Sequence, residues 1–205
     1  MKVLIINGSP RIDGNSSILV NELISTFKKE EVEVDLYQIG NKAIRGCMAC
    51  GYCHEHGECV FKDDVNDLAK RFKEADGLIV TSPVYYASAN GSIISLLDRL
   101  FQSSDFPKRF KVGAAFAIAR RGGTSATFDE LNKYFTIAQM PVVSGKYWNN
   151  GFGLVPGDIN KDEEGLQNAR VVARNMAFLM KAIKDAKEKY GFPELEKPKS
   201  THFIK

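Results

Sequence analysis

An apolar run at residues 3–6 leads directly into Asn7-Gly8-Ser9-Pro10-Arg11-Ile12-Asp13-Gly14-Asn15-Ser16-Ser17, and an amphipathic helical pattern follows to about Lys29. Strand, polar loop and helix in this order place free backbone N–H groups and the positive end of the helix dipole around one anion. The loop adds hydroxyl and amide groups, and a guanidinium that can hold a phosphate in a fork: Ser9, Arg11, Asn15, Ser16 and Ser17. The stretch therefore predicts a phosphate site after the first strand of an α/β fold.

Two better-known phosphate loops do not match this stretch. Gly8 and Gly14 are separated by five residues, one more than a P-loop has, and Asn15 stands where the P-loop lysine belongs. The dinucleotide fingerprint G-x-G-x-x-G is absent as well. Without a lysine for a β- or γ-phosphate, a terminal monophosphate is the better match. The alternative is an ordinary strand-to-helix turn with a good helix cap.

Gly8-Ser9-Pro10-Arg11, followed by Gly14-Asn15-Ser16, resembles the FMN-phosphate loop of flavodoxin-like NAD(P)H-dependent FMN reductases. The resemblance covers most of the chain, from Met1 to about Met180, and the cysteines described below narrow it to the branch that resembles iron–sulfur flavoproteins. It implies a flavodoxin-like fold, FMN as the bound cofactor and NAD(P)H as co-substrate.

Five strand-and-helix units can be traced along the chain. Apolar runs predict strands at residues 2–7, 77–81, 112–118 and 140–143, and an alternating apolar and polar pattern predicts one at 32–37. Helical patterns are expected at about 15–29, 63–72, 90–101, 125–138 and 162–190. Together they predict an α/β fold: a flavodoxin-like, doubly wound, five-stranded parallel sheet of order 2-1-3-4-5 with helices on both faces. A ligand then lies where the strand order reverses, beyond the first and third strands.

Composition and length bound the other classes of function. With 205 residues, the whole chain (residues 1–205) is expected to form one FMN-binding domain with a cysteine-rich loop at 40–61 and a polar tail at 191–205. The formal net charge of +3 and the absence of a basic run argue against nucleic acid as a partner. No apolar run is long enough for a membrane span, and the absence of an export signal favours the cytoplasm.

A second loop follows the third strand and reads Ser82-Pro83-Val84-Tyr85-Tyr86-Ala87-Ser88-Ala89-Asn90-Gly91. Tyrosines pack well on the flat face of a flavin, and backbone N–H groups can bond its polar edge. The resemblance implies that this loop borders the isoalloxazine through Pro83, Val84, Tyr85 and Tyr86, with Asn90 and Gly91 beside it. The alternative is that the two tyrosines only cap the core.

A third loop, Arg120-Arg121-Gly122-Gly123-Thr124, follows the fourth strand. Cationic and N–H groups from Arg120, Gly122 and Gly123 would stabilise an anionic reduced flavin near its pyrimidine edge, whereas the alternative is a solvated turn. A glycine- and asparagine-rich segment, Gly145–Gly157, contains Tyr147, Trp148 and Phe152 and is expected to help cover the flavin.

All four cysteines belong to one motif, Cys47-x-x-Cys50-x-x-Cys53-x5-Cys59. Consecutive C-x-x-C steps resemble the ferredoxin ligation of a 4Fe-4S cluster, and the fourth cysteine matches the compact motif of iron–sulfur flavoproteins. Free thiols, a redox disulfide and zinc remain as alternatives. The loop lies between the second strand and the next helix, so we expect it at the same sheet edge as the flavin loops.

Two functions follow from this sequence. The first is an FMN-dependent enzyme that passes electrons from NAD(P)H to a flavin, a quinone or another small acceptor, with no obligatory catalytic side chain. The alternative is an iron–sulfur flavoprotein that carries electrons from ferredoxin, which the cysteine motif favours. The resemblance also implies a homodimer or homotetramer.

Overall fold

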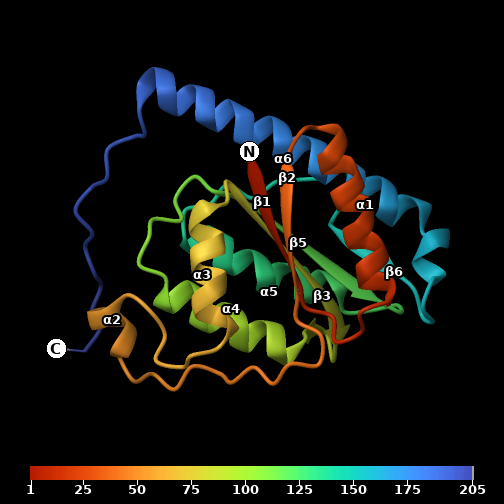
Figure 1. Cartoon of the computed structure of the whole chain (residues 1–205), viewed down its shortest axis with the longest axis horizontal. Coiled ribbons are helices and arrows are strands. Elements are labelled where there is room, and N and C mark those ends of the chain that lie inside the picture. The colour runs from red at the N-terminus through yellow and green to blue at the C-terminus, as the bar shows by residue number, and fades with distance from the viewer. Residues whose placement is uncertain (205) are drawn as a thin grey trace.

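The structure is a computed structural model of the chain, and it describes residues 1–204. Its parallel strands are β1 (Lys2–Asn7), β2 (Glu33–Gln38), β3 (Gly77–Tyr85), β5 (Val112–Ala119) and β6 (Asn150–Phe152). They lie in the order β2-β1-β3-β5-β6, and a two-residue strand, β4 (Ser88–Ala89), pairs antiparallel with the end of β3. Counted along the chain, the parallel strands follow the expected 2-1-3-4-5 order of a flavodoxin-like fold (Figure 1).

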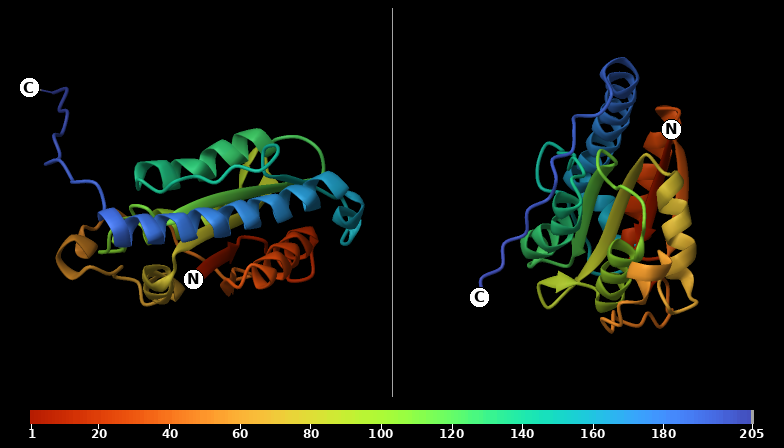
Figure 2. Two further views of the ribbon diagram at one scale, coloured as in Figure 1. Left: turned by 90° about the horizontal axis from the view of Figure 1, so that it is seen from above. Right: turned by 90° about the vertical axis from the view of Figure 1, so that its left-hand side faces the viewer.

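Helices cover both faces of this sheet (Figure 2). They are α1 (Asn15–Lys29) and α6 (Glu163–Tyr190) on one face, and α3 (Asp64–Glu74), α4 (Gly91–Ser103) and α5 (Thr124–Ile137) on the other. Alternate residues of β1 enter the two cores, because Val3 and Ile5 belong to one cluster while Leu4 and Ile6 belong to the other. No helix within residues 1–204 is long and apolar enough to cross a membrane.

The fifth strand lies later in the chain than the sequence predicts. Residues 140–143 make only one bridge to β5, between Val142 and Gly113. Pro141 has no N–H group to donate to a ladder, although its carbonyl accepts from the Gly113 N–H at 2.8 Å. The chain then leaves β5 and returns at Asn149, whose carbonyl accepts from the Ala117 N–H at 3.0 Å. The prediction of a strand at 140–143 was therefore wrong, and β6 follows directly after this return.

A buried asparagine fills the interval between Val143 and β6. The Oδ1 of Asn168, on α6, accepts from the N–H groups of Lys146 and Tyr147 at 2.8 and 3.3 Å. Its Nδ2 donates to the Tyr147 carbonyl at 3.3 Å. One side chain thus satisfies backbone groups that a sheet ladder would otherwise pair. Gly145 is needed beside it, because a Cβ there would lie 2.1 Å from Asn168 Oδ1.

The cysteine-rich loop runs along α4, away from the sheet edge where β1 and β3 end (Figure 1). It contains one short helix, α2 (Tyr52–His56). Cys59 Sγ contacts Arg99 in the middle of α4, and His54 contacts Gln102 near its end. Because α4 begins at the sheet edge with Gly91 and leads away from it, the cysteines do not lie at that edge. The expectation that they do was wrong, since only the start of the loop lies there.

The C-terminal segment lies outside the regular elements. The segment from Gly191 to Ile204 forms neither helix nor strand, and nearly all of it is exposed. It extends away from the end of α6 (Figure 2). Its first part touches the body of the protein, where the rings of Phe192 and Phe110 stack 4.7 Å apart.

Candidate functional site: a cofactor edge and a cysteine cavity

The ends of β1, β3 and β5 meet the start of α1 at a cavity of about 160 Å³. Most of the residues predicted to bind FMN line it: Ser9, Arg11, Asn15, Ser16, Pro83, Val84, Tyr85 and Arg120. Gly153, Leu154 and Pro156 line another side, and they belong to the segment expected to help cover a flavin. The predicted loops therefore meet where the strand order reverses, as a doubly wound sheet requires. We call residues 145–157 the covering segment; its aromatic residues Tyr147, Trp148 and Phe152 line a different cavity.

The N-terminus of α1 presents backbone donors to this cavity. Its N-cap is Gly14, and no side chain caps the helix N–H groups with a hydrogen bond. The first turn of α1 holds no acidic residue. Ser9 is buried, and its Oγ bonds both the N–H and the carbonyl of Arg11 at 3.1 Å, which folds the loop back on itself. Free helix N–H groups and an uncompensated helix dipole fit the phosphate of FMN.

A buried asparagine at the end of β1 ties this loop to the sheet. Asn7 is fully buried, and its Oδ1 accepts from the Ser9 N–H at 3.2 Å and from Thr81 Oγ1 at 3.0 Å. Its Nδ2 donates to Gln38 Oε1 at 2.7 Å and to Ser17 Oγ at 3.3 Å. Ser17 thus contacts this network and is absent from the cavity lining. Neither Asn7 nor Gln38 was predicted as a site residue; the available signal for Asn7 was its position directly after four apolar residues, and Gln38 carried no comparable signal.

Asn15 holds the covering segment in place. Its Oδ1 accepts from the N–H groups of Gly157 and Ile159 at 3.0 and 3.3 Å, and its Nδ2 donates to the Val155 carbonyl at 3.0 Å. Ile159 lies in a short 3-10 helix, η1 (Asp158–Lys161). These bonds use both the Oδ1 and the Nδ2 of Asn15. The side chain therefore affects the cavity mainly by fixing residues 153–159 beside it.

A second hollow of about 380 Å³ adjoins the first. It is lined by Val84, Tyr86, Ala87, Ala119, Arg120, Arg121, Gly122 and Gly123. Tyr86 and Ala87 form the two-residue turn between β3 and β4, with φ of 52° and 59°, and the turn leaves Tyr86 fully exposed. Gly123 has φ of 89°, and a Cβ there would lie 2.8 Å from Ala87 Cα. The two loops therefore pack tightly enough to require glycine at this position.

Asn90 and Gly91 line neither hollow. Asn90 is the N-cap of α4, where its side chain accepts from the Ser92 N–H at 2.7 Å. Its own N–H donates to Ser82 Oγ at 2.9 Å, which fixes the end of β3. A Cβ at Gly91 would meet nothing within 4 Å. The structure thus gives Asn90 a capping role, and the position of both residues beside a flavin stays a prediction.

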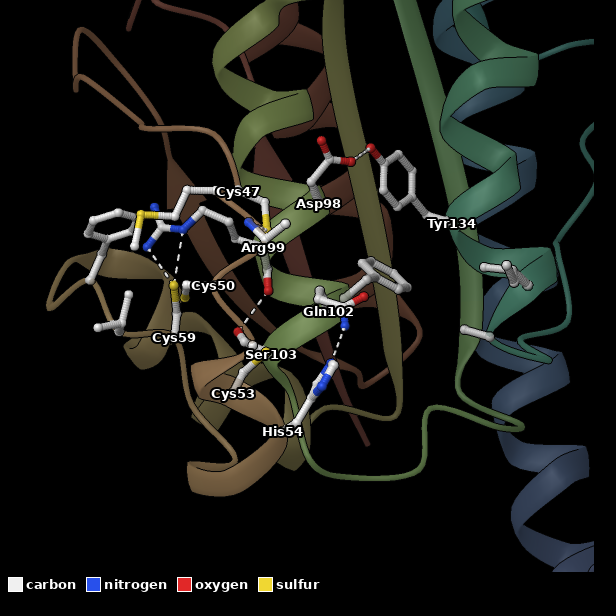
Figure 3. Close-up of a pocket in the computed structure, with 18 of the residues that line it drawn as sticks. Cys47, Cys50, Cys53, His54, Cys59, Asp98, Arg99, Gln102, Ser103 and Tyr134 are labelled. Carbon is white, nitrogen blue, oxygen red and sulfur yellow. Dashed lines mark hydrogen bonds between the residues drawn. The ribbon is translucent and has the colours of Figure 1, made fainter.

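The cysteine loop borders a larger cavity of about 810 Å³, which also reaches α4 and α5 (Figure 3). All four predicted cysteine ligands line it. Cys47 and Cys50 are exposed, Cys53 and Cys59 are half-buried, and no disulfide joins these four residues. The cavity shares no lining residue with the two hollows at the other end of α4.

Arg99, on α4, holds the sulfur of Cys59 (Figure 3). Its Nε and Nη2 atoms each lie 3.2 Å from Cys59 Sγ, and the guanidinium binds both carboxylate oxygens of Asp63 at 2.7 and 2.8 Å. Burial lowers the pKa of Arg99, but the hydrogen bonds to Asp63 and Cys59 more than offset this, so its pKa is raised. The guanidinium is therefore a permanent cation beside the sulfur.

The backbone of Cys59 is fixed as well. Asn66, on α3, accepts from the Cys59 N–H at 2.9 Å and donates to the Cys59 carbonyl at 2.9 Å. By contrast, Cys47 has one weak local contact, in which its Sγ accepts from the Ala49 N–H at 3.4 Å. Cys59 is thus held by two helices, while the exposed cysteines lie on the outer part of the loop.

The four cysteines surround the cavity and do not converge on one point. Within residues 1–204, no three His, Cys, Asp or Glu side chains gather around a position for a single ion. A tetrahedral zinc site is therefore not preformed in this loop. A cubane cluster makes a different demand, because each of its irons takes one thiolate, so the thiolates surround the group instead of meeting at one point. Four cysteines around one cavity fit that ligand set.

The rim of the cysteine cavity is held by polar pairs. Tyr134 Oη donates to Asp98 Oδ1 at 2.5 Å, and burial together with this hydrogen bond raises the pKa of Tyr134 above its ordinary value. Tyr134 is therefore a hydrogen-bond donor at neutral pH. On the opposite side, Gln102 Nε2 and His54 Nε2 lie 3.1 Å apart and join α4 to α2.

Comparison with known proteins agrees with this geometry. The NADPH-dependent FMN reductase family model matches residues 1–154. An iron-sulfur flavoprotein of Methanocaldococcus jannaschii is 36% identical over 192 residues, which cover 90% of this chain and 100% of the relative. An iron-sulfur flavoprotein of Methanosarcina thermophila is 29% identical over 193 residues, which cover 92% of this chain and 100% of the relative.

A solved structure shows the shared fold. The NAD(P)H:quinone oxidoreductase from Methanothermobacter marburgensis superposes with a TM-score of 0.67 at 16% identity, covering 86% of this chain and 96% of that one. The family match spans well over half of the chain and includes the phosphate loop and the loops after β3 and β5. The chain therefore belongs to the NADPH-dependent FMN reductase family and is an FMN-dependent oxidoreductase that uses NAD(P)H.

Proposed function

We propose that this oxidoreductase holds a 4Fe-4S cluster on Cys47, Cys50, Cys53 and Cys59, and that electrons pass between this cluster and FMN. The observation that carries the proposal is the single cavity of about 810 Å³ that all four cysteines line. Four thiolates are the usual ligand set of such a cluster. Support also comes from relatives at 36% and 29% identity that bear the name iron-sulfur flavoprotein. We place this chemistry in the cytoplasm, where thiols remain reduced.

For FMN we propose a position along the two adjoining hollows. The N–H groups at the start of α1 and the guanidinium of Arg11 bind the phosphate, while Asn15 keeps the covering segment closed over it. The ring lies toward Val84 and Tyr86, with Arg120 beside it. When bound, FMN accepts a hydride from NAD(P)H and releases electrons singly or in pairs. The positive charge of Arg120 and nearby N–H groups favour the anionic reduced ring.

The two sites lie in different parts of one chain. The cysteine cavity shares no lining residue with the FMN hollows, because the loop follows α4 away from the sheet edge. We therefore propose that electrons cross between subunits, with a homodimer or homotetramer bringing the cysteine loop of one copy to the FMN of another. The exposure of Cys47 and Cys50 suits such a contact.

The electron acceptor is proposed to be a flavin, a quinone or another small molecule. A second candidate function is electron transfer from reduced ferredoxin through the cluster to FMN. The exposed cysteine loop favours it, because a protein partner can approach a redox group on that surface. In this case reduced ferredoxin would reduce the flavin faster than NAD(P)H does.

Anaerobic stopped-flow mixing separates these functions. Protein reconstituted with FMN, iron and sulfide is mixed in turn with NADPH, with NADH and with reduced ferredoxin, and the flavin absorbance is followed. The proposed oxidoreductase predicts fast bleaching by a nicotinamide cofactor. Faster bleaching by reduced ferredoxin than by either nicotinamide cofactor would establish the second candidate. A preparation that binds FMN but takes up no iron would contradict the cluster and leave a plain flavin reductase.

A further inference from the structure

Arg99 is a buried cation that the proposed FMN chemistry does not use. Its side chain is only 1% exposed, and it is one of the largest fully buried side chains among the described residues. Burying a guanidinium is costly unless its donors are all matched by acceptors. The acceptors around it therefore indicate what the residue is for.

Every N–H group of this guanidinium has an acceptor. Arginine carries five donors in a fixed fork. Two bind the carboxylate of Asp63, and one binds the Arg45 carbonyl at 3.2 Å. The remaining two, from Nε and Nη2, both bind Cys59 Sγ at 3.2 Å. The ring of Phe61 lies 4.9 Å from the guanidinium carbon and closes one face. The position of Arg99 is thus set by five hydrogen bonds and a ring.

The use of two donors on one sulfur is informative. A thiol sulfur is a weak acceptor, whereas a thiolate is a strong one and carries the charge that a guanidinium favours. Asp63 alone would satisfy the charge of Arg99, yet the fork is aimed so that its other edge meets Cys59. The backbone of Cys59 is already fixed by Asn66. The sulfur is therefore held in position beside a fixed cation.

We propose that Arg99 is the positioning residue of the iron–sulfur cluster, aimed by Asp63 and donating two hydrogen bonds to the Cys59 ligand. This inference rests on the proposed function, since it requires the cluster to bind at the four cysteines. Cys59 would then be the ligand whose position is already fixed, whereas Cys47 and Cys50 are exposed. Hydrogen bonds from a cation to a ligand sulfur stabilise the more negative, reduced cluster, so Arg99 raises the reduction potential.

A purely structural role would use the same contacts to tie α4 to the start of α3, where Asp63 is the N-cap. The free energy of unfolding cannot separate the two roles. The reduction potential of the cluster can, because an Arg99 that only joins α4 to α3 would not change it. Removing Arg99 alone would leave the Asp63 carboxylate without its cation. The main variant is therefore Arg99→Met combined with Asp63→Asn, since asparagine caps a helix as well as aspartate does.

The matched control is Arg45→Met. Arg45 is exposed, and its guanidinium carbon lies 4.9 Å from the same Phe61 ring, but its side chain does not contact Cys59 in this structure. The full-length variants, together with Asp63→Asn and Arg99→Lys, are reconstituted without oxygen. The iron content, the FMN content and the midpoint potential of the cluster are then measured, the last by dithionite titration followed by electron paramagnetic resonance.

The cluster in the double variant should have a more negative reduction potential than the cluster in Asp63→Asn. The expected difference is at least about 59 mV, which corresponds to a tenfold change in the equilibrium constant for one-electron reduction. The double variant should also lose iron to a chelator faster, while Arg45→Met matches the wild type and every variant binds FMN. If the double variant binds no FMN and is unfolded, Arg99→Lys decides, because it keeps the charge but loses the fork; a more negative potential supports the proposal.

Two outcomes overturn the inference, and they are distinguishable. If the wild type takes up iron but its potential and chelator resistance survive in the Arg99 variants, Arg99 is only a helix clamp and the cluster stands. If the wild type itself takes up no iron, the proposed cluster fails, and the role of Arg99 fails with it.

Discussion

The FMN edge and the cysteine cavity are built in different ways. The FMN edge consists of strand ends and one helix start, so the sheet itself sets its geometry, and Asn7 locks the loop to two neighbouring strands. The cysteine cavity borders an irregular loop whose firm attachment is at Cys59, through Arg99 and Asn66. At strand ends the sheet itself fixes the positions of the site residues. On a loop those positions depend on a few side chains that reach the loop from other elements.

The largest expected effect is the selective loss of the cluster. Cys50→Ser should reduce the iron from about four per chain to a small fraction of that, because one thiolate of the ligand set is gone. FMN binding should not change, since Cys50 lies outside both FMN hollows. Iron, sulfide and flavin analysis of anaerobically reconstituted protein measures both. Met48→Ala, in the same cavity lining, is the control, and equal iron loss in both variants would contradict the assignment.

The converse change acts at the other site. Arg11→Ala should weaken FMN binding by about 1.5–3 kcal/mol, because a charge-assisted bond to the phosphate is lost. The iron content should stay at the wild-type level. Fluorescence titration of the apoprotein with FMN gives the affinity. Arg174→Ala serves as the control, since Arg174 is exposed and absent from both FMN hollows. An unchanged affinity in Arg11→Ala would show that the loop holds no phosphate.

A smaller effect is expected from Asn15, because it acts through the covering segment. Asn15→Ala removes three hydrogen bonds to residues 155–159 and should weaken FMN binding by about 1–2 kcal/mol. Hydrogen exchange of residues 153–159 should also rise in the protein without FMN. Asn160→Ala changes an exposed residue of η1 and should do neither. Weaker FMN binding with unchanged exchange would instead make Asn15 a direct phosphate ligand.

The smallest effect concerns the start of the cysteine loop. Asp64 accepts hydrogen bonds from Lys42 and Tyr37, and these bonds lower the pKa of its carboxyl group. A lowered folded-state pKa contributes stability above the unfolded-state pKa, and this contribution is lost as pH falls through the folded-state value. Because the pair is well exposed, Asp64→Asn should cost only about 0.5 kcal/mol at pH 7.

Urea unfolding tests this contribution of Asp64 to stability. The wild type and Asp64→Asn are unfolded at neutral pH and at a pH below the lowered pKa. The difference in unfolding free energy should shrink toward zero in acid, where the carboxyl group is protonated in both states. A difference of equal size at both values would assign the effect to packing and not to charge.

The sequence predicts the helices and strands that depend on their own residue pattern. It does not predict segments whose positions depend on residues distant in sequence. The bounds of α1 follow from its own apolar spacing and agree with the structure. The position of β6 does not, because Asn168 on α6 supports the backbone that departs from β5 before it. The predicted FMN residues largely share one cavity because strand ends meet by topology. The path of the cysteine loop depends on α4, which is remote in sequence, and therefore could not be derived.

Two redox groups at separate places in one chain can be counted directly. The measurement is the FMN, iron and sulfide content of anaerobically reconstituted protein, with the electron paramagnetic resonance spectrum of its reduced form. It should show about one FMN, four irons and four sulfides per chain and the signal of one reduced cubane cluster. One FMN with no bound iron, or iron that remains when all four cysteines are replaced, would contradict it.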